Sequence, residues 1–124
     1  MHMTKIMIVD DDKEATDLLE NLLKLEGYTP VSVNDSTIAV QRANAENPDL
    51  FLIDLMMPEI DGFKLCRLLR ADSKFAHTPV IILTALSDTD SRAVAYGAGA
   101  TDYLTKPYHP NELKSIIKGL VNKS

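Results

Sequence analysis

The stretch Ile-Met-Ile-Val at residues 6–9 decides the fold, because four apolar residues run without interruption and three Asp residues, 10–12, follow at once. A strand with one face in water would alternate apolar and polar residues, whereas a continuous run is typical of a strand buried on both faces of a parallel sheet. Phe-Leu-Ile at 51–53 and Val-Ile-Ile-Leu at 80–83 repeat this pattern. The three runs predict the centre of a parallel sheet that helices cover.

Weaker strand signals and helical patterns fill the rest of the chain. Residues 30–33 and 101–104 are short and partly polar, as edge strands often are. Apolar residues with the i, i+3, i+4, i+7 spacing of a helix face cover residues 15–23 and 113–121, and weaker helical patterns cover about 36–46, 62–71 and 87–96. Gly27 is suited to end the first of these helices, and Pro110 to begin the last. Five strand–helix units predict an α/β fold: a doubly wound five-stranded parallel sheet, strand order 2-1-3-4-5, with helices on both faces.

The composition limits the classes of function. Of 124 residues, 45% are hydrophobic and 25% are charged, as in an ordinary globular domain. We expect a single domain over residues 1–124, structured over about 4–122. No apolar run approaches the about 20 residues that cross a bilayer, and neither a signal core nor a cysteine pair is present, so we expect a cytoplasmic protein that does not bind a membrane. Thirteen basic residues against 18 acidic ones leave a charge of −5, which argues against direct nucleic-acid binding.

Residues that could bind a metal ion or take part in catalysis follow four of the five predicted strands. In an open α/β sheet the functional site lies beyond the carboxyl ends of the strands. The residues at these ends are Asp10, Asp11, Asp12, Asp54, Thr84, Ala85 and Lys106. Each alone has an ordinary explanation, such as a helix cap for the three Asp residues or a surface position for the lysine. Their joint placement favours one common site.

Spacing and charge predict how these groups would meet. Neighbouring strands lie about 4.8 Å apart, so Lys106 starts roughly 10 Å from the third strand, and its flexible side chain can span much of that gap to Asp54. Carboxylates about 5 Å apart repel by roughly 3 kcal/mol at an effective dielectric of about 20. A divalent cation and the lysine would balance three carboxylates, and an all-oxygen site suits Mg²⁺. Asp54 would then be the nucleophile for a phosphoryl group whose oxygens contact the cation, Lys106 and the Thr84 hydroxyl.

Several motifs accompany these residues. They are the acidic pair after residues 6–9, Asp-Leu-Met-Met-Pro at 54–58, Asp-Gly at 61–62, Thr-Ala at 84–85, Gly-Ala-Gly-Ala at 97–100 and Lys-Pro at 106–107. With them the chain resembles, over nearly its whole length, the receiver domains of two-component response regulators, including the free-standing chemotaxis type. The resemblance implies a phosphoacceptor that receives a phosphoryl group on Asp54 from a histidine kinase or a histidine phosphotransfer protein and then switches a partner-binding surface.

The resemblance also implies a metal site. Mg²⁺ would be held by Asp10, Asp11 and Asp54 together with the main-chain carbonyl of Met56. Because residues 10–12 are all Asp, the acidic pair of the family could be either residues 10 and 11 or residues 11 and 12. We assign the first two because they adjoin the strand, and we assign Asp12 to the N-terminus of the following helix.

Four further positions carry a role in the resemblance. Thr84 and Lys106 would contact the phosphoryl group, with Lys106 and Asp54 as the catalytic pair, and Ala85 would leave room beside it. Tyr103 matches the aromatic switch of the family, although an edge-strand surface tyrosine is the simpler explanation of that residue alone. The output would act through a downstream protein or an output domain absent from this chain. A phosphorylation-dependent dimer through the predicted helix at 87–96, the strand at 101–104 and the helix at 113–121 is a further expectation.

Two other classes share some of these features. A phosphatase of the haloacid dehalogenase type also uses an aspartate nucleophile but needs a second acid two residues later, where this chain has Met56. A flavodoxin shares the sheet order, but the acidic residues 10–12 would repel the FMN phosphate. We predict a signalling switch and not an enzyme, because the domain would modify itself and turn over no separate substrate. We interpret Cys66 as a small core residue, and His77 and His109 as solvent-facing residues of loops.

Overall fold

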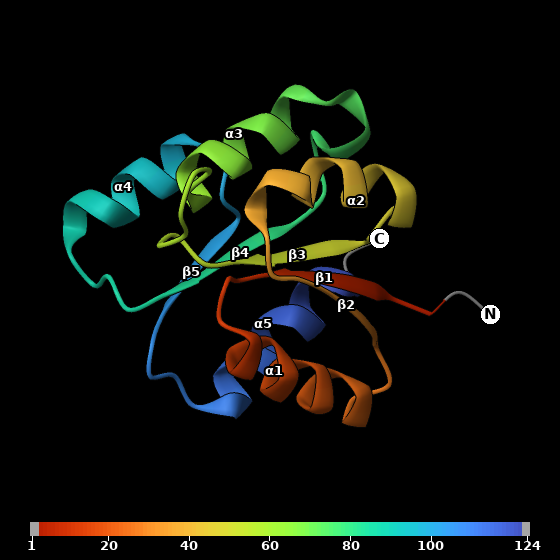
Figure 1. Cartoon of the computed structure of the whole chain (residues 1–124). Coiled ribbons are helices and arrows are strands. Elements are labelled where there is room, and N and C mark those ends of the chain that lie inside the picture. Colours follow the sequence, from red (N-terminus) through yellow and green to blue (C-terminus); the bar gives the residue numbers. More distant parts are fainter. Residues whose placement is uncertain (1–2, 123–124) are drawn as a thin grey trace.

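Five parallel strands form one sheet in the computed structural model, which describes residues 3–122. The strands are β1 (Lys5–Val9), β2 (Thr29–Val33), β3 (Leu50–Ile53), β4 (Val80–Thr84) and β5 (Asp102–Thr105). They pair in the order β2-β1-β3-β4-β5, which confirms the predicted topology (Figure 1). Each predicted strand lies within one residue of the observed bounds.

Helices cover both faces of the sheet, as predicted. They are α1 (Lys13–Leu25), α2 (Ala39–Glu46), α3 (Gly62–Ala71), α4 (Thr89–Gly97) and α5 (Pro110–Val121). Figure 1 shows α1 and α5 on one face and α2, α3 and α4 on the other. Gly27 has a φ of +86° directly after the end of α1, in the left-handed region that glycine adopts at little cost.

Two helices, α2 and α4, begin later than predicted. The helix expected over residues 36–46 begins as a short 3₁₀ helix, η1 (Ser36–Ile38), in which the Asp35 side chain accepts a hydrogen bond from Thr37 N. The helix expected from residue 87 begins at Thr89, because Asp88 is its cap and accepts from Ser91 N and Ser91 Oγ at 2.9 and 2.8 Å. A second 3₁₀ helix, η2 (Ser73–Phe75), was not predicted.

The core has two layers, one on each face of the sheet, because successive strand residues point to opposite faces. Toward α2, α3 and α4 the buried strand side chains include Met7, Val9, Phe51, Ile53, Val80 and Ile82. Toward α1 and α5 they include Ile6, Ile8, Leu50, Leu52, Ile81 and Leu83. The central strands are therefore apolar over residues 6–9, 50–53 and 80–83, and only Lys5 at the start of β1 and Thr84 at the end of β4 are polar. Cys66 is buried on α3, as expected. Within residues 3–122, no helix is long and apolar enough to cross a membrane.

Candidate functional site

The carboxyl ends of β1, β3, β4 and β5 meet at one edge of the sheet. Val9 pairs with Ile53, and Thr84 pairs with Thr105. Beyond these pairs the ladder continues, since Asp54 N donates to Val9 O at 3.0 Å and Lys106 N donates to Thr84 O at 2.7 Å. The residues that follow the strands thus lie side by side, as the sequence predicted.

Lys106 reaches two carboxylates that follow different strands, Asp10 after β1 and Asp54 after β3. Its Nζ lies 3.1 Å from Asp10 Oδ2 and 3.5 Å from Asp54 Oδ2. The two acidic side chains are only 6% and 13% exposed. The lysine side chain therefore spans the position of β4 to reach them, and its charge offsets the repulsion between two nearly buried carboxylates.

The environment keeps this lysine charged. Burial by itself lowers the pKa of Lys106, but the charges of Asp54 and Asp10 and the hydrogen bonds to both carboxylates outweigh that effect. The pKa of Lys106 therefore lies above its ordinary value. The Lys106 ammonium group therefore carries its positive charge at the point where both carboxylates converge.

The three consecutive Asp residues have different environments. Asp10 is nearly buried, and its Oδ1 accepts from Asp12 N at 3.0 Å. Asp12 is the N-cap of α1 and accepts from Glu14 N at 3.0 Å, which confirms its predicted place at the helix N-terminus. Asp11 is exposed.

The donor atoms fit Mg²⁺ in kind, although not all predicted ligands converge. Among residues 3–122, no three His, Cys, Asp or Glu side chains lie close enough together to hold a metal ion, so Asp11 is not brought in as a third ligand. Asp10 and Asp54 supply two carboxylates, and Met56 N donates to Asp54 Oδ1 at 3.3 Å, which places the Met56 main chain at the same loop. Mg²⁺ is commonly bound through one or two carboxylates and keeps several waters. The side-chain pair is therefore sufficient for such a site.

The end of β4 is linked to Tyr103 through one residue. Thr84 is fully buried, and its Oγ1 accepts from Leu86 N at 3.4 Å. Tyr103 is 4% exposed, and its hydroxyl donates to Leu86 O at 2.6 Å. The tyrosine is thus not the surface residue that its edge strand alone suggests. Ala85 lies between these contacts and is exposed.

Arg92 of α4 covers the Tyr103 ring. Its Cζ lies 4.7 Å from the ring centroid, and its Nη2 donates to Thr105 Oγ1 at 3.1 Å. Burial raises the pKa of Tyr103, as do the charges of Asp88 and Asp54, while Arg92 opposes the shift. Arg92 was not predicted as a site residue, because its contact depends on how α4 packs on β5.

Two residues after β2 also reach the site and were not predicted. Asn34 Nδ2 donates to Asp10 O at 2.9 Å, and Ser36 Oγ donates to Pro58 O at 3.1 Å. Neither residue carries an obvious signature in the sequence, because Asn34 is an uncharged amide and Ser36 lies three residues beyond the end of β2. The available signal was that β2 must end at the same edge as the other strands.

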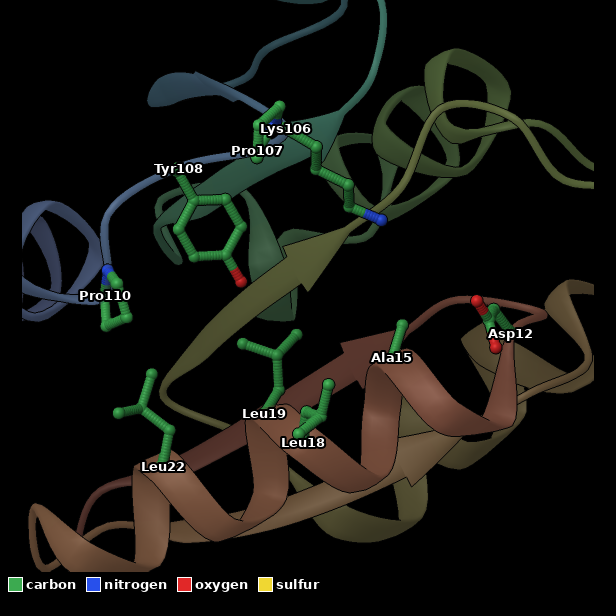
Figure 2. A pocket seen from close by; sticks show the side chains of 9 residues that line it. All are labelled: Asp12, Ala15, Leu18, Leu19, Leu22, Lys106, Pro107, Tyr108 and Pro110. Atoms are coloured by element: carbon green, nitrogen blue, oxygen red, sulfur yellow. The ribbon is translucent and has the colours of Figure 1, made fainter.

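An apolar hollow of about 550 Å³ adjoins the acidic cluster. It is lined by Asp12, Ala15, Leu18, Leu19 and Leu22 of the α1 region, by Lys106, Pro107 and Tyr108 between β5 and α5, and by Pro110, the first residue of α5. Figure 2 shows Asp12 and the Lys106 ammonium at one end of the hollow and Leu22 and Pro110 at the other. A partner seated in the hollow would therefore lie next to the carboxylates.

Comparison with known proteins identifies the class. The model of the response regulator receiver domain matches residues 6–118. The transcriptional regulatory protein GltR of Pseudomonas aeruginosa is 40% identical over 119 residues, which are 96% of this chain and 49% of that protein. A putative response regulator structure from Chloroflexus aurantiacus has a TM-score of 0.93 at 32% identity, over 98% of this chain and 100% of that one. The chain belongs to the family of response regulator receiver domains of two-component systems.

Further matches agree with this class. The BeF3-activated N-terminal receiver domain of Klebsiella pneumoniae RstA has a TM-score of 0.91 at 30% identity, over 97% of this chain and 100% of that one. The chain spans about half the length of the curated relatives it matches. The predicted family and fold are confirmed, and the phosphatase and flavodoxin alternatives no longer apply.

Proposed function

We propose that this domain accepts a phosphoryl group on Asp54 from a histidine kinase or a histidine phosphotransfer protein, in a reaction that depends on Mg²⁺. The observation that carries the proposal is the position of Lys106 Nζ between Asp10 Oδ2 and Asp54 Oδ2. A phosphoryl group brings further negative charge to a carboxylate, so fixed positive charge must already be in place. Lys106 supplies one such charge.

The transfer forms one bond and breaks another. An oxygen of the Asp54 carboxylate attacks phosphorus, the bond from phosphorus to the donor imidazole breaks, and the released imidazole nitrogen takes up a proton. Lys106 and the Thr84 hydroxyl contact the transferred oxygens, while exposed Ala85 leaves room beside them. Asp10 and Asp54, together with the Met56 carbonyl, would hold Mg²⁺, which would supply additional charge neutralisation. Since the domain itself carries the product, it acts as a switch and not as an enzyme with turnover.

Phosphorylation would change a surface through Leu86. The Thr84 hydroxyl and the Tyr103 hydroxyl bind the two sides of this residue's main chain, its N–H and its carbonyl. If a phosphoryl oxygen attracts the Thr84 hydroxyl, the hydrogen bond from Leu86 N to that hydroxyl would be lost. Leu86 could then move, and with it the Tyr103 ring and the surface formed by α4, β5 and α5. Two-state elements of this kind turn a local charge into a change of partner affinity, including affinity for a second copy.

The phosphodonor and the output use different surfaces in this proposal. The apolar hollow between α1 and the segment after β5 adjoins Lys106, so a protein donor that delivers phosphate to Asp54 would seat on it. The curated relatives are named as transcriptional regulators. We extend this to a transcriptional output that acts through a further region or partner and not through direct nucleic-acid contact by residues 3–122.

The test is phosphorylation by acetyl phosphate, followed by intact-mass measurement. Wild type with Mg²⁺ is expected to gain one phosphoryl group, and neither Asp54→Asn nor wild type with a chelator should gain one. Asp61→Asn is the matched control, because Asp61 lies in the same loop but caps α3 by accepting from Lys64 N. No modification of wild type, or equal modification of Asp54→Asn, would overturn the proposal.

A further inference from the structure

The segment that follows β2 connects the two acid-bearing loops of the site. Asn34 Nδ2 donates to the carbonyl of Asp10 at 2.9 Å, on the β1 side. Ser36 Oγ donates to the carbonyl of Pro58 at 3.1 Å, on the β3 side. Residues 34–36 therefore hold the main chain of both loops that carry the acids of the site, although neither Asn34 nor Ser36 is itself acidic.

The Asp10 side of this connection is fixed at several points. Asp10 N donates to Val33 O at 3.1 Å, so consecutive residues at the end of β2 bind both the N–H and the carbonyl of Asp10. Asn34 Nδ2 also donates to Thr16 Oγ1 at 3.0 Å. Thr16 is fully buried, and its hydroxyl donates to Lys13 O in the first turn of α1. Asn34 thus joins β1, β2 and α1 around the acidic turn.

The β3 side has a different anchor. Ser36 is buried, and the Pro58 carbonyl that it binds also accepts from Ile60 N at 2.8 Å. Glu59, between them in sequence, has a φ of +67°, a conformation that costs free energy for a residue with a side chain. The Met56 carbonyl lies two residues before Pro58. The hydrogen bond from Ser36 therefore supports a turn whose shape sets the position of that carbonyl.

We propose that Asn34 and Ser36 are positioning residues that set the separation between the Asp10 loop and the Asp54–Pro58 loop, and through it the affinity for Mg²⁺. This inference rests on the proposed Mg²⁺ site. Mg²⁺ requires nearly ideal octahedral geometry at about 2.0–2.1 Å, so a small change in the spacing of its ligands weakens binding more than it would for a larger ion. Neither residue touches the ion in this scheme.

The test compares Mg²⁺ dissociation constants, measured by titration calorimetry, for wild type, Asn34→Ala and Ser36→Ala. Each substitution is expected to raise the dissociation constant by about threefold to tenfold, below the 10–100-fold typical of partners bonded directly to a ligand side chain. The rate of phosphorylation by acetyl phosphate at saturating Mg²⁺ should return to within about twofold of wild type, because a high Mg²⁺ concentration restores the occupancy of the site. The variants should differ from wild type only in the Mg²⁺ concentration that phosphorylation requires.

Two matched controls separate positioning from general stability. Asn44→Ala removes an amide that donates to Val40 O within α2, and Ser73→Ala removes an exposed hydroxyl in η2. Both should bind Mg²⁺ as wild type does, and urea unfolding without Mg²⁺ reports the stability of every variant. The inference is overturned if the Asn34 and Ser36 variants bind Mg²⁺ as tightly as wild type, or no more weakly than controls of equal stability. If wild type binds no Mg²⁺, both this inference and the Mg²⁺ dependence of the proposed function fail. If wild type binds Mg²⁺ and the Asn34 and Ser36 variants bind it equally well, only this inference fails and the proposed function stands.

Discussion

At the scale of single residues, two apolar side chains near Asp54 would determine how long a phosphoryl group survives. Met56 is 59% exposed and Leu86 is half-buried, two residues after Asp54 and Thr84 respectively. Neither can orient an attacking water by a hydrogen bond, so we predict slow self-dephosphorylation. Met56→Asn should accelerate the decay by about tenfold, below the 10²–10⁴-fold of a well-placed general base. The rate of phosphoryl loss is measured by intact mass after acetyl phosphate is removed, with Leu68→Asn on α3 as the control. A fast decay that Met56→Asn leaves unchanged would contradict the prediction.

His109 was expected to be a solvent-facing loop residue, and it is exposed, but it also caps α5. Its Nδ1 accepts from Asn111 N at 3.1 Å, and Glu112 Oε1 accepts from His109 N at 3.4 Å, which is a capping box. His109→Ala should lower the free energy of unfolding by about 1 kcal/mol. His109→Asp should not lower it, because a carboxylate accepts the same hydrogen bond and complements the helix dipole. Urea unfolding tests this against His77→Ala, an exposed loop histidine; equal values for the two Ala variants would refute it.

At the scale of elements, the loop from β3 to α3 depends on Gly62. A Cβ atom at this position would collide with the carbonyl of Asp54 and approach the Cα of Leu55 to 2.7 Å. Since both contacts are backbone, the strand end that carries Asp54 must shift, and Gly62→Ala should lower the free energy of unfolding by about 1–3 kcal/mol. Phosphorylation of Asp54 should also slow. Gly119→Ala in α5 is the control: its Cβ meets nothing within 4 Å, and the change should stabilise by up to about 1 kcal/mol. Equal effects of both substitutions on unfolding would count against this role.

The packing of α4 on β5 predicts a second effect. Arg92 stacks on the Tyr103 ring, with its Cζ 4.7 Å from the ring centroid, and donates to the Thr105 hydroxyl. Arg92→Ala should therefore lower the free energy of unfolding by about 1 kcal/mol and expose the ring to solvent. The Tyr103 ring resonances in an NMR spectrum should then move toward the values of a solvent-exposed tyrosine. Arg67→Ala, at an exposed position on α3, should leave them unchanged. Unaltered Tyr103 resonances in Arg92→Ala would show that the ring is held by burial and by its hydroxyl alone.

The strands were more predictable than the helix boundaries, for a physical reason. A strand buried on both faces needs apolar residues throughout, so its bounds are visible as the bounds of an apolar run. A helix begins where a side chain caps it, and several Asp and His residues compete for that role in the sequence. The start of α4 at Thr89 and the 3₁₀ turn before α2 follow from the caps Asp88 and Asp35, which periodicity does not reveal.

At the scale of the whole molecule, the parallel sheet explains both what the sequence predicted of the site and what it missed. Because all strands end at one edge, the approach of Lys106 to Asp54 followed from strand order and side-chain length alone. The inward position of Tyr103 and the contacts of Asn34 and Ser36 depend on side-chain direction and on bonds to main-chain carbonyls, which carry no residue signature. The exposed position of Asp11 likewise depends on local geometry. Part of the −5 charge is concentrated at this edge, opposite a fixed lysine.

The position of the apolar hollow next to this edge leads to a prediction about the phosphodonor. A protein donor must bring its phosphohistidine to Asp54, and the hollow between α1 and the segment after β5 is the apolar surface beside that point, whereas acetyl phosphate needs no such surface (Figure 2). Leu18 is 72% exposed and lines the hollow; Leu25 is 83% exposed on the same helix but does not line it. Leu18→Ala should therefore weaken transfer from a histidine-phosphorylated kinase by about 1–2 kcal/mol, or roughly 5–30-fold in kcat/KM. Leu25→Ala should leave the transfer unchanged, and both variants should react normally with acetyl phosphate. Equal loss in both leucine variants, or a loss with acetyl phosphate as well, would place the donor elsewhere on the molecule.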